Sequence, residues 1–270
     1  MPSKDLGMFS FFAGPTPRLF AHRGASGDAP ENTLVAFQRA VELGIVYAEL
    51  DVHASRDGQV VVSHDATLER TTNGRGHIRE YSLAELQSVD AGFHFSPDGG
   101  RTFPFRGTEV KISTLVEVLQ SFPTLHFTIE IKQVDPPVEE LVIAAVRACG
   151  REQHVILASE HDTVLARVRA LVPEIASSFA YGEVVEFIQR VTTHQLSDYR
   201  PPGQALQIPP EFQGIPLVTA QTVAAAHALD CEMHVWTIDD HEEMDRLLDL
   251  DVDGIMSNFP ARLLEVVRNR

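Results

Sequence analysis

Two acidic residues with one residue between them stand in the segment Ala48–His53, and His64 follows them closely. The segment is predicted to be a strand, and side chains alternate along a strand, so Glu49 and Asp51 point to the same side. Neighbouring carboxylates repel each other unless a cation lies between them, and Mg²⁺ and Ca²⁺ prefer carboxylate oxygen. Together with a histidine, the pair favours metal-assisted hydrolysis of a phosphate ester. A solvated surface pair is the alternative.

The charge of the chain restricts its partners. Its 270 residues contain 22 Lys and Arg against 38 Asp and Glu, which gives a formal net charge of −16. Nucleic acid is not expected as a partner, because its binding depends on cationic side chains that neutralise phosphates. A phosphate ester would also be repelled by the whole protein, so a bound cation and local basic residues must reverse the sign inside the site.

The cysteines and the first residues indicate the cellular compartment. Cys149 and Cys231 have no metal-ligand spacing and are expected to be ordinary thiols, which fits a reducing environment. The apolar patch Met8–Phe12 is too short for a signal-peptide core or a membrane span, and no other apolar run approaches the ~20 residues that a span requires. We expect the patch to pack on the domain or fray, and the protein to be cytoplasmic.

Predicted strands alternate with predicted helices along most of the chain. Eight apolar segments are expected as strands, centred on Leu19, Val46, Phe127, Val155, Ile175, Leu206, Val235 and Ile255. Such alternation implies parallel strands with right-handed crossovers, and eight units in roughly 250 residues predict an α/β fold of the (β/α)₈ barrel type. An open, doubly wound sheet is the competitor. We assign 18–268 to one domain, 66–112 to an insertion within it, and 1–17 to an N-terminal extension.

In such barrels the reacting groups lie at the carboxyl ends of the strands. Polar residues are predicted at these ends in several separate segments: His22, Arg23, Glu49, Asp51, His64, Glu130, Lys132 and Trp236. Buried parallel strands are otherwise continuous apolar runs, so polar residues at their ends are hard to explain as solvated surface. For Glu130 alone, a salt bridge to Lys132 is the alternative.

Several motifs in the same order resemble the glycerophosphodiester phosphodiesterase family. They are Ala21-His22-Arg23-Gly24, Ala29-Pro30-Glu31-Asn32-Thr33, Ala48-Glu49-Leu50-Asp51-Val52, Val62-Ser63-His64-Asp65, Thr67-Leu68 with Arg70-Thr71-Thr72-Asn73-Gly74, Ile129-Glu130-Ile131-Lys132, Val235-Trp236-Thr237-Ile238 and Val252-Asp253-Gly254-Ile255. The resemblance covers roughly 18–260 and implies a TIM barrel with a small insertion after the second strand region. One departure is Ser257-Asn258, where many relatives carry Thr-Asp, and it puts in doubt a supporting role for an acid at this position.

The resemblance implies three sets of site residues. They are the metal ligands Glu49, Asp51 and Glu130, the catalytic pair His22 and His64, and the substrate and phosphate contacts Arg23, Lys132 and Trp236. The cofactor would be one divalent cation, Mg²⁺ or Ca²⁺. An ordinary imidazole pKa of about 6.5 suits one histidine to take a proton and the other to give one. Trp236 has a plain core role as its alternative, and Asn32 is expected first as a helix cap.

The expected activity is hydrolysis of glycerophosphodiesters, small-molecule substrates, to sn-glycerol 3-phosphate and an alcohol. One alternative is phospholipase D-like hydrolysis of lysophospholipids, for which the apolar residues 9–12 are the only hint. A non-catalytic phosphate-binding barrel is another, since a fold does not fix a function. The alcohol, the choice of cation, the histidine that acts as the acid, the order of the steps and the oligomeric state stay open.

Overall fold

Eight parallel strands form a barrel in the computed structural model, which describes residue 6 and residues 9–270. The strands are β1 (Arg18–His22), β2 (Tyr47–Ala54), β4 (His126–Ile131), β5 (Val155–Ala158), β6 (Ala176–Ser177), β7 (Ala205–Ile208), β10 (Glu232–Val235) and β11 (Gly254–Ser257). They pair in the order β6-β5-β4-β2-β1-β11-β10-β7, and a parallel bridge between Ser178 and Ala205 joins the two ends. The prediction of a (β/α)₈ TIM barrel is confirmed.

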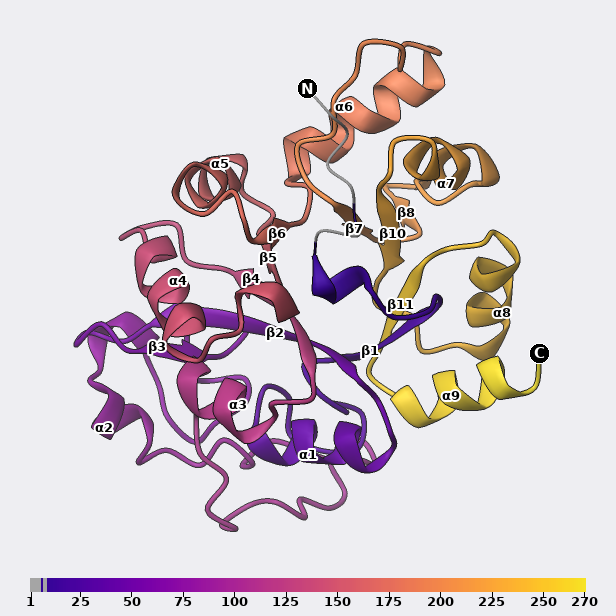
Figure 1. Ribbon diagram of the computed structural model, residues 1–270. Coiled ribbons are helices and arrows are strands. Elements are labelled where there is room, and N and C mark those ends of the chain that lie inside the picture. Colours follow the sequence, from indigo (N-terminus) through magenta and orange to yellow (C-terminus); the bar gives the residue numbers. More distant parts are fainter. Residues whose placement is uncertain (1–5, 7–8) are drawn as a thin grey trace.

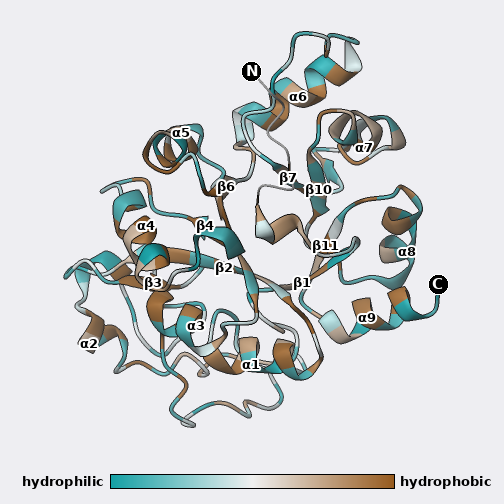
Figure 2. Ribbon diagram, in the orientation of Figure 1, coloured by the Kyte–Doolittle hydropathy of each residue, from teal (hydrophilic) through white to brown (hydrophobic). Residues whose placement is uncertain are grey.

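Helices surround the barrel in a ring (Figure 1). They are α1 (Leu34–Glu42), α3 (Leu115–Ser121), α4 (Glu139–Ala148), α5 (Asp162–Leu171), α6 (Tyr181–Thr192), α7 (Ala220–His227), α8 (His241–Asp249) and α9 (Pro260–Arg268). Hydrophobic and hydrophilic residues alternate along these helices, as expected where one face packs on strands and the other faces water (Figure 2). Thr33, Thr114, Thr219 and Asp240 cap their helices by accepting a backbone N–H, which fixes where each helix begins.

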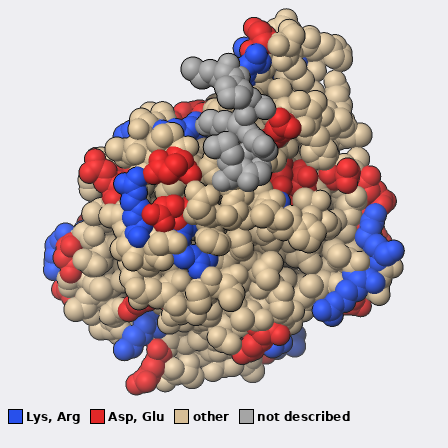
Figure 3. Space-filling model, in the orientation of Figure 1, with Lys and Arg blue, Asp and Glu red and all other residues tan. Residues whose placement is uncertain are grey.

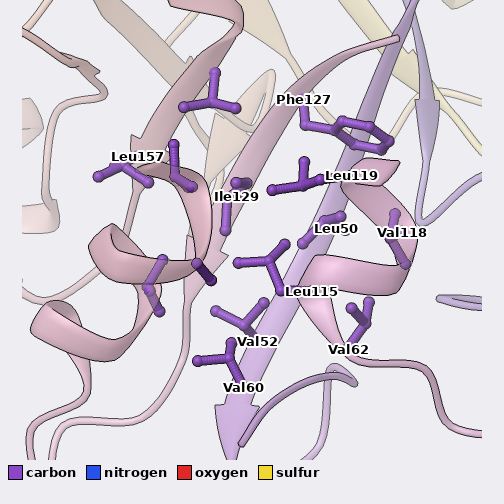
Figure 4. Close-up of a cluster of buried hydrophobic side chains, with 14 of the residues drawn as sticks. Leu50, Val52, Val60, Val62, Leu115, Val118, Leu119, Phe127, Ile129 and Leu157 are labelled. Carbon is purple, nitrogen blue, oxygen red and sulfur yellow. The ribbon is translucent and has the colours of Figure 1, made fainter. Parts of the chain in front are cut away.

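Alternation along β2 separates the core from the site. Leu50 and Val52 are fully buried and pack with β4 and α3, whose Leu115, Val118 and Leu119 point toward them (Figure 4). Glu49 and Asp51, which alternate with these two residues along the strand, therefore face the barrel interior. A strand that is apolar on one side and acidic on the other can pack under a helix and still present two carboxylates within the barrel.

Several predicted boundaries differ from the structure. The extended piece expected over 59–63 is shorter, β3 (Val60–Val62), and it pairs antiparallel with β2 as a hairpin outside the eight barrel strands. The strand expected over 175–181 is reduced to the two residues of β6, and α6 already begins at Tyr181. A small hairpin, β8 (Glu211–Phe212) with β9 (Ile215–Pro216), was not predicted. Short apolar runs do not show where a strand gives way to a helix.

Residues 66–112 form a loop-rich segment with a 3₁₀ turn, η3 (Ile78–Glu80), and a single-turn helix, α2 (Leu83–Leu86). The segment has a small apolar cluster made of Val61, Leu68, Ile78, Leu86, Ala91, Val110 and Ile112. Val61 belongs to β3, so the cluster fastens the segment to the hairpin beside β2. Its Arg70 reaches the site described below.

The N-terminal segment covers the amino end of the barrel. The 3₁₀ turn η2 (Ser10–Phe12) lies in the middle of the ring of helices (Figure 1), and Phe11 is fully buried. Arg18, 1% exposed, donates to the Phe12 carbonyl and forms two 2.7 Å hydrogen bonds with Glu232. Met8 of the predicted patch lies outside the described residues. On the surface seen from this side, charged side chains lie mostly toward the rim (Figure 3).

None of the helices in the described ranges, residue 6 and 9–270, has the length and apolar character that crossing a membrane requires.

Candidate active site

Strand register brings three carboxylates together at the carboxyl end of the barrel. Asp51 of β2 is the direct neighbour of Glu130 on β4, and Glu49 lies two residues before Asp51 on the same face. One oxygen from each of these three residues lies within 4.8 Å of the others. Glu49 and Asp51 are 4% and 1% exposed, so solvent does little to screen their mutual repulsion.

Two cationic side chains flank the three carboxylates. Lys132 Nζ lies 2.8 Å from Glu130 and 3.4 Å from Asp51, and Arg23 Nε lies 3.3 Å from Asp51. The backbone N–H of Arg23 also donates to Glu49 Oε2 over 3.1 Å. The salt bridge between Glu130 and Lys132 therefore exists, but as part of the acidic cluster and not instead of it. When all three carboxylates are ionised, three negative charges against two positive ones leave the group net negative.

The acidic cluster perturbs its own pKa values. Burial, with the charges of Asp51 and Glu130, raises the pKa of Glu49 well above its ordinary value. Burial also raises the pKa of Glu130, and the charge of Asp51 adds to it against the opposing effect of Lys132. For Lys132, burial acts to lower the pKa, but the charges of Glu130 and Asp51 outweigh it and the pKa rises. The site thus favours an additional positive charge.

Asn32 orients Asp51 and is not the helix cap that was expected. Its Nδ2 donates to Asp51 Oδ2 over 2.8 Å, and its Oδ1 accepts from the Asp51 backbone N–H over 3.3 Å. Thr33 caps α1 instead. Asn32 has a φ of +59°, a left-handed conformation that asparagine tolerates better than most residues, and this conformation turns its side chain away from the cap position.

His22 lies at the end of β1, where the register sets it beside Glu49. Its Nε2 is 3.8 Å from Glu49 Oε2, and its Nδ1 is 2.8 Å from Asn258 Oδ1. Burial lowers the pKa of His22, and the positive charge of Arg23 lowers it further. The ring therefore has one nitrogen held by an amide and the other directed toward the acidic cluster.

His64 is held from one side by a chain of ion pairs. Its Nδ1 lies 2.6 Å from Asp65 Oδ1, and Arg70 Nε donates to Asp65 Oδ2 over 2.6 Å. Burial acts to raise the pKa of Asp65, but the hydrogen bonds from Arg70 and His64 outweigh it and lower the pKa to about 2. Arg70 also binds Glu31, whose Oε1 pairs with Arg23 over 2.9 Å. A continuous series of ion pairs, through Asp65, Arg70 and Glu31, thus links His64 to Arg23.

Two further side chains lie near the site: Trp236, which was expected to contact substrate, and His53, which was not assigned a role. Trp236 follows β10 and is 40% exposed, so a plain core role for it is wrong. His53 follows Asp51 on the same face of β2, and its Nε2 lies 3.1 Å from the backbone carbonyl of His64. His53 thus fixes the loop that carries His64.

The donor atoms of the acidic cluster fit a hard divalent cation. Oxygen ligands from carboxylates are those that Mg²⁺ and Ca²⁺ prefer. Asp51 Oδ1 is buried and has no hydrogen-bond partner in the part of the chain that the structure describes. Such an orphaned buried oxygen is costly unless a positive charge approaches it, and Lys132 Nζ lies 3.4 Å away, beyond the range of a good hydrogen bond. A metal ion would satisfy this oxygen.

Sequence reasoning did not assign Glu31, Asp65 and Arg70, which connect the predicted site residues. All three lie within the quoted motifs, and Glu31 adjoins Asn32 and Asp65 adjoins His64. No role was assigned to Arg70, because it lies in the loop-rich segment 66–112, where no periodic pattern places a side chain.

Three comparisons with known proteins find chains similar to this one in sequence and fold. A model of the glycerophosphoryl diester phosphodiesterase family matches residues 22–262. A glycerophosphodiester phosphodiesterase of Caldanaerobacter subterraneus subsp. tengcongensis is 33% identical over 93% of this chain and 97% of its own. Lysophospholipase D GDPD1 of Rattus norvegicus is 26% identical over 93% of this chain and 86% of its own. An Oleispira antarctica phosphodiesterase, solved in complex with the product sn-glycerol-3-phosphate, is 29% identical with a TM-score of 0.74, covering 93% of this chain and 97% of that one.

Proposed function

The chain belongs to the glycerophosphoryl diester phosphodiesterase family and is a phosphoric diester hydrolase, and on this premise we propose how its residues divide the work. Glycerophosphodiesters are its substrates, and we propose sn-glycerol 3-phosphate and an alcohol as the products. The observation that carries the proposal is the cluster of Glu49, Asp51 and Glu130, whose oxygens lie within 4.8 Å of one another beside His22. Such a cluster can hold a cation, and a cation stabilises the negative charge that develops on the phosphorus-bound oxygens during the reaction.

Glu49, Asp51 and Glu130 would hold one divalent cation, Mg²⁺ or Ca²⁺. When bound, the cation supplies polarisation of the phosphoryl oxygens and neutralises part of their charge. Lys132 and Arg23 attract and orient the phosphate, Lys132 as a compact charge and Arg23 through its planar fork. These charges overcome the repulsion expected from a chain with a net charge of −16.

His22 and His64 would act as the general acid and base. In the reaction, an oxygen forms a new bond to phosphorus while the bond from phosphorus to the alcohol oxygen breaks. One histidine takes the proton of the attacking oxygen, and the other gives a proton to the departing alcohol. The attacking oxygen is that of water or of the glycerol 2-hydroxyl, which would give a cyclic phosphate first. A substrate that lacks the 2-hydroxyl separates the routes, because full turnover of it excludes the cyclic one.

Release of sn-glycerol 3-phosphate from glycerophosphocholine tests the proposal. EDTA should stop release, and added Mg²⁺ or Ca²⁺ should restore it, with the better ion identifying the cofactor. Glu130→Gln should lose both the activity and its dependence on the ion. Exposed Glu265→Gln, in α9, is the matched control and should behave like the wild type. Undiminished release in EDTA from metal-stripped protein would contradict the metal assignment.

Hydrolysis of lysophospholipids is a second candidate, favoured by the surface around the site and by the named activity of the rat relative. Phe9, Phe11 and Phe12, the residues first considered for lipid contact, are buried at the opposite end of the barrel and do not support it. Instead, exposed apolar side chains follow three barrel strands: Tyr181 at the start of α6, Phe212 and Ile215 in the β8–β9 hairpin, and Trp236 after β10. Parallel assays with lysophosphatidylcholine and glycerophosphocholine distinguish the two substrates.

We also propose that the protein works in the cytoplasm, a proposal supported by the free thiol of Cys149.

A further inference from the structure

Asn258 lies beside His22 because of the register between the first and last strands of the barrel. Ala21 of β1 pairs with Ser257 of β11, so the next residue of each strand emerges at the same end, side by side. Asn258 Oδ1 is 2.8 Å from His22 Nδ1 and 2.8 Å from the hydroxyl of Ser26, which donates to it. Asn258 is therefore in direct contact with a proposed catalytic ring.

The carboxylate of Asp239 fixes the orientation of this amide. Asp239 Oδ2 accepts from Asn258 Nδ2 over 2.7 Å, and Oδ1 accepts from the Asn258 backbone N–H over 2.8 Å and from Ser257 Oγ over 2.9 Å. An ionised carboxylate only accepts hydrogen bonds, so the nitrogen of the amide must face Asp239. The oxygen of the amide must then face His22.

Asp239 is itself held in place by the surrounding backbone. The N–H of Ile238 donates to the carbonyl of Met256 on β11 over 2.9 Å, and Arg262 of α9 donates to the Asp239 carbonyl over 2.6 Å. The loop after β10 is thus fastened to β11 and α9. The carboxylate that many relatives are expected to carry at position 258 is supplied in this chain by residue 239, so the departure at Asn258 does not remove an acid from this network.

We propose that Asn258, anchored by Asp239, is a positioning residue that holds His22 as the Nδ1–H tautomer with Nε2 directed at the reacting centre. An amide oxygen cannot donate, so Nδ1 must carry the proton of the neutral ring and Nε2 keeps its lone pair. Nε2 is the nitrogen that lies 3.8 Å from Glu49 Oε2, on the side of the acidic cluster. The role of this arrangement in catalysis rests on the proposed function, whereas the tautomer itself follows from the hydrogen bonds alone.

The tautomer can be measured without any turnover. Two-bond ¹⁵N–¹H spectra of the metal-free protein with labelled histidine, at about pH 8 where the ring is neutral, distinguish Nδ1–H from Nε2–H. Signals are assigned to His22 by their loss in His22→Gln. The wild type should show the Nδ1–H form, whereas Asn258→Ala should show a mixture or the Nε2–H form. Ser257→Ala removes a hydrogen bond to Asp239 but none to His22, and should keep the Nδ1–H form.

A second variant keeps the proposal testable if Asn258→Ala does not fold. The double change Asp239→Asn, Asn258→Asp exchanges the two side chains, and Asn at 239 can still accept from Ser257 while donating to Asp at 258. It should keep the Nδ1–H form. Its kcat should stay well above that of Asn258→Ala, which we expect to fall roughly 10- to 100-fold. An Nε2–H ring in the wild type or in the exchange variant would overturn the proposal.

The two measurements, of tautomer and of turnover, distinguish failure of the proposed function from failure of the positioning role. A wild type that releases no sn-glycerol 3-phosphate yet shows Nδ1–H that is lost in Asn258→Ala supports the positioning role and contradicts the activity alone. If Asn258→Ala keeps the Nδ1–H form and turns over within about threefold of the wild type, the positioning role is refuted while the activity stands.

Discussion

Glu49→Gln should stabilise the metal-free protein while abolishing its response to metal. Glu49 is buried, and its oxygen lies within 4.8 Å of oxygens of Asp51 and Glu130. At that distance two unit charges repel by about 3.5 kcal/mol at an effective dielectric constant of about 20. Removing Glu49 removes two such repulsions when all three groups are ionised. Attraction to Arg23 and Lys132, and uptake of a proton, already offset most of this energy.

We therefore expect a net gain of about 1 to 3 kcal/mol in the free energy of unfolding at pH 7. For a domain of this size that corresponds to a rise in Tm of about 2 to 12 °C. Scanning calorimetry in EDTA measures it, with the exposed Glu265→Gln as a control that should leave Tm unchanged. Added Mg²⁺ or Ca²⁺ should raise the Tm of the wild type and not that of Glu49→Gln.

The stability of the metal-free protein should depend on pH because of Glu49. Burial and the neighbouring carboxylates raise the pKa of Glu49 above its ordinary value of 4.5, so above pH 4.5 the folded protein holds a proton that the unfolded chain has released. The stability of the metal-free wild type therefore falls as the pH rises from 4.5 through the folded pKa. The advantage of Glu49→Gln should grow between about pH 5 and 7. A variant that melts below the wild type in EDTA, or that still gains stability from the metal, would refute the reasoning.

Four further substitutions test other parts of the molecule. His22→Asn and His64→Asn should each lower kcat for release of glycerol 3-phosphate by about 10²- to 10⁴-fold, since each removes a proton-transfer group. Arg18→Met should lower the free energy of unfolding by about 3 to 5 kcal/mol in denaturant titrations, because it leaves the buried Glu232 without its guanidinium partner and with the His234 ring, 2.9 Å away, as a remaining contact. Trp236→Ala should raise KM for glycerophosphocholine roughly three- to tenfold, and less for a diester without a cationic alcohol.

Matched variants distinguish these effects from general damage. His194→Asn changes an exposed histidine with a φ of +57°, which asparagine tolerates, and should leave kcat unaltered. Arg147→Met removes a half-exposed pair with Glu174 and should cost at most about 1 kcal/mol. An Arg18→Met protein as stable as Arg147→Met, or equal rises in KM for both diesters in Trp236→Ala, would contradict the corresponding prediction.

The fold was predictable because buried parallel strands are apolar runs and because capped helices separate them. The predicted centres Val46 and Ile175 each fall one residue before the strand they mark, β2 and β6. The junction from β6 to α6 was not predictable, because residues 175–181 are apolar or small throughout and lack a turn signal.

The spacing of Glu49 and Asp51 predicted one acidic face, since a strand has a period of two. The roles of Asn32 and Asn258 could not be read in the same way. Asn32 reaches Asp51 through a left-handed backbone conformation, and Asn258 reaches His22 through pairing of strands more than 230 residues apart. Neither a single φ angle nor a long-range register is encoded in a local pattern.

Pairing of the first strand with the last also determines when the chain can finish folding. Arg18 of β1 and Glu232 are separated by 214 positions, and β1 meets β11 only after both have been made. At a synthesis rate of about 5 to 20 residues per second, the charged side chain of Arg18 waits about 10 to 40 s for its partner. Throughout that time β1 has an open edge and η2 has no completed barrel end to cover. A growing chain of this protein is thus most vulnerable to misassociation just before its last strands emerge.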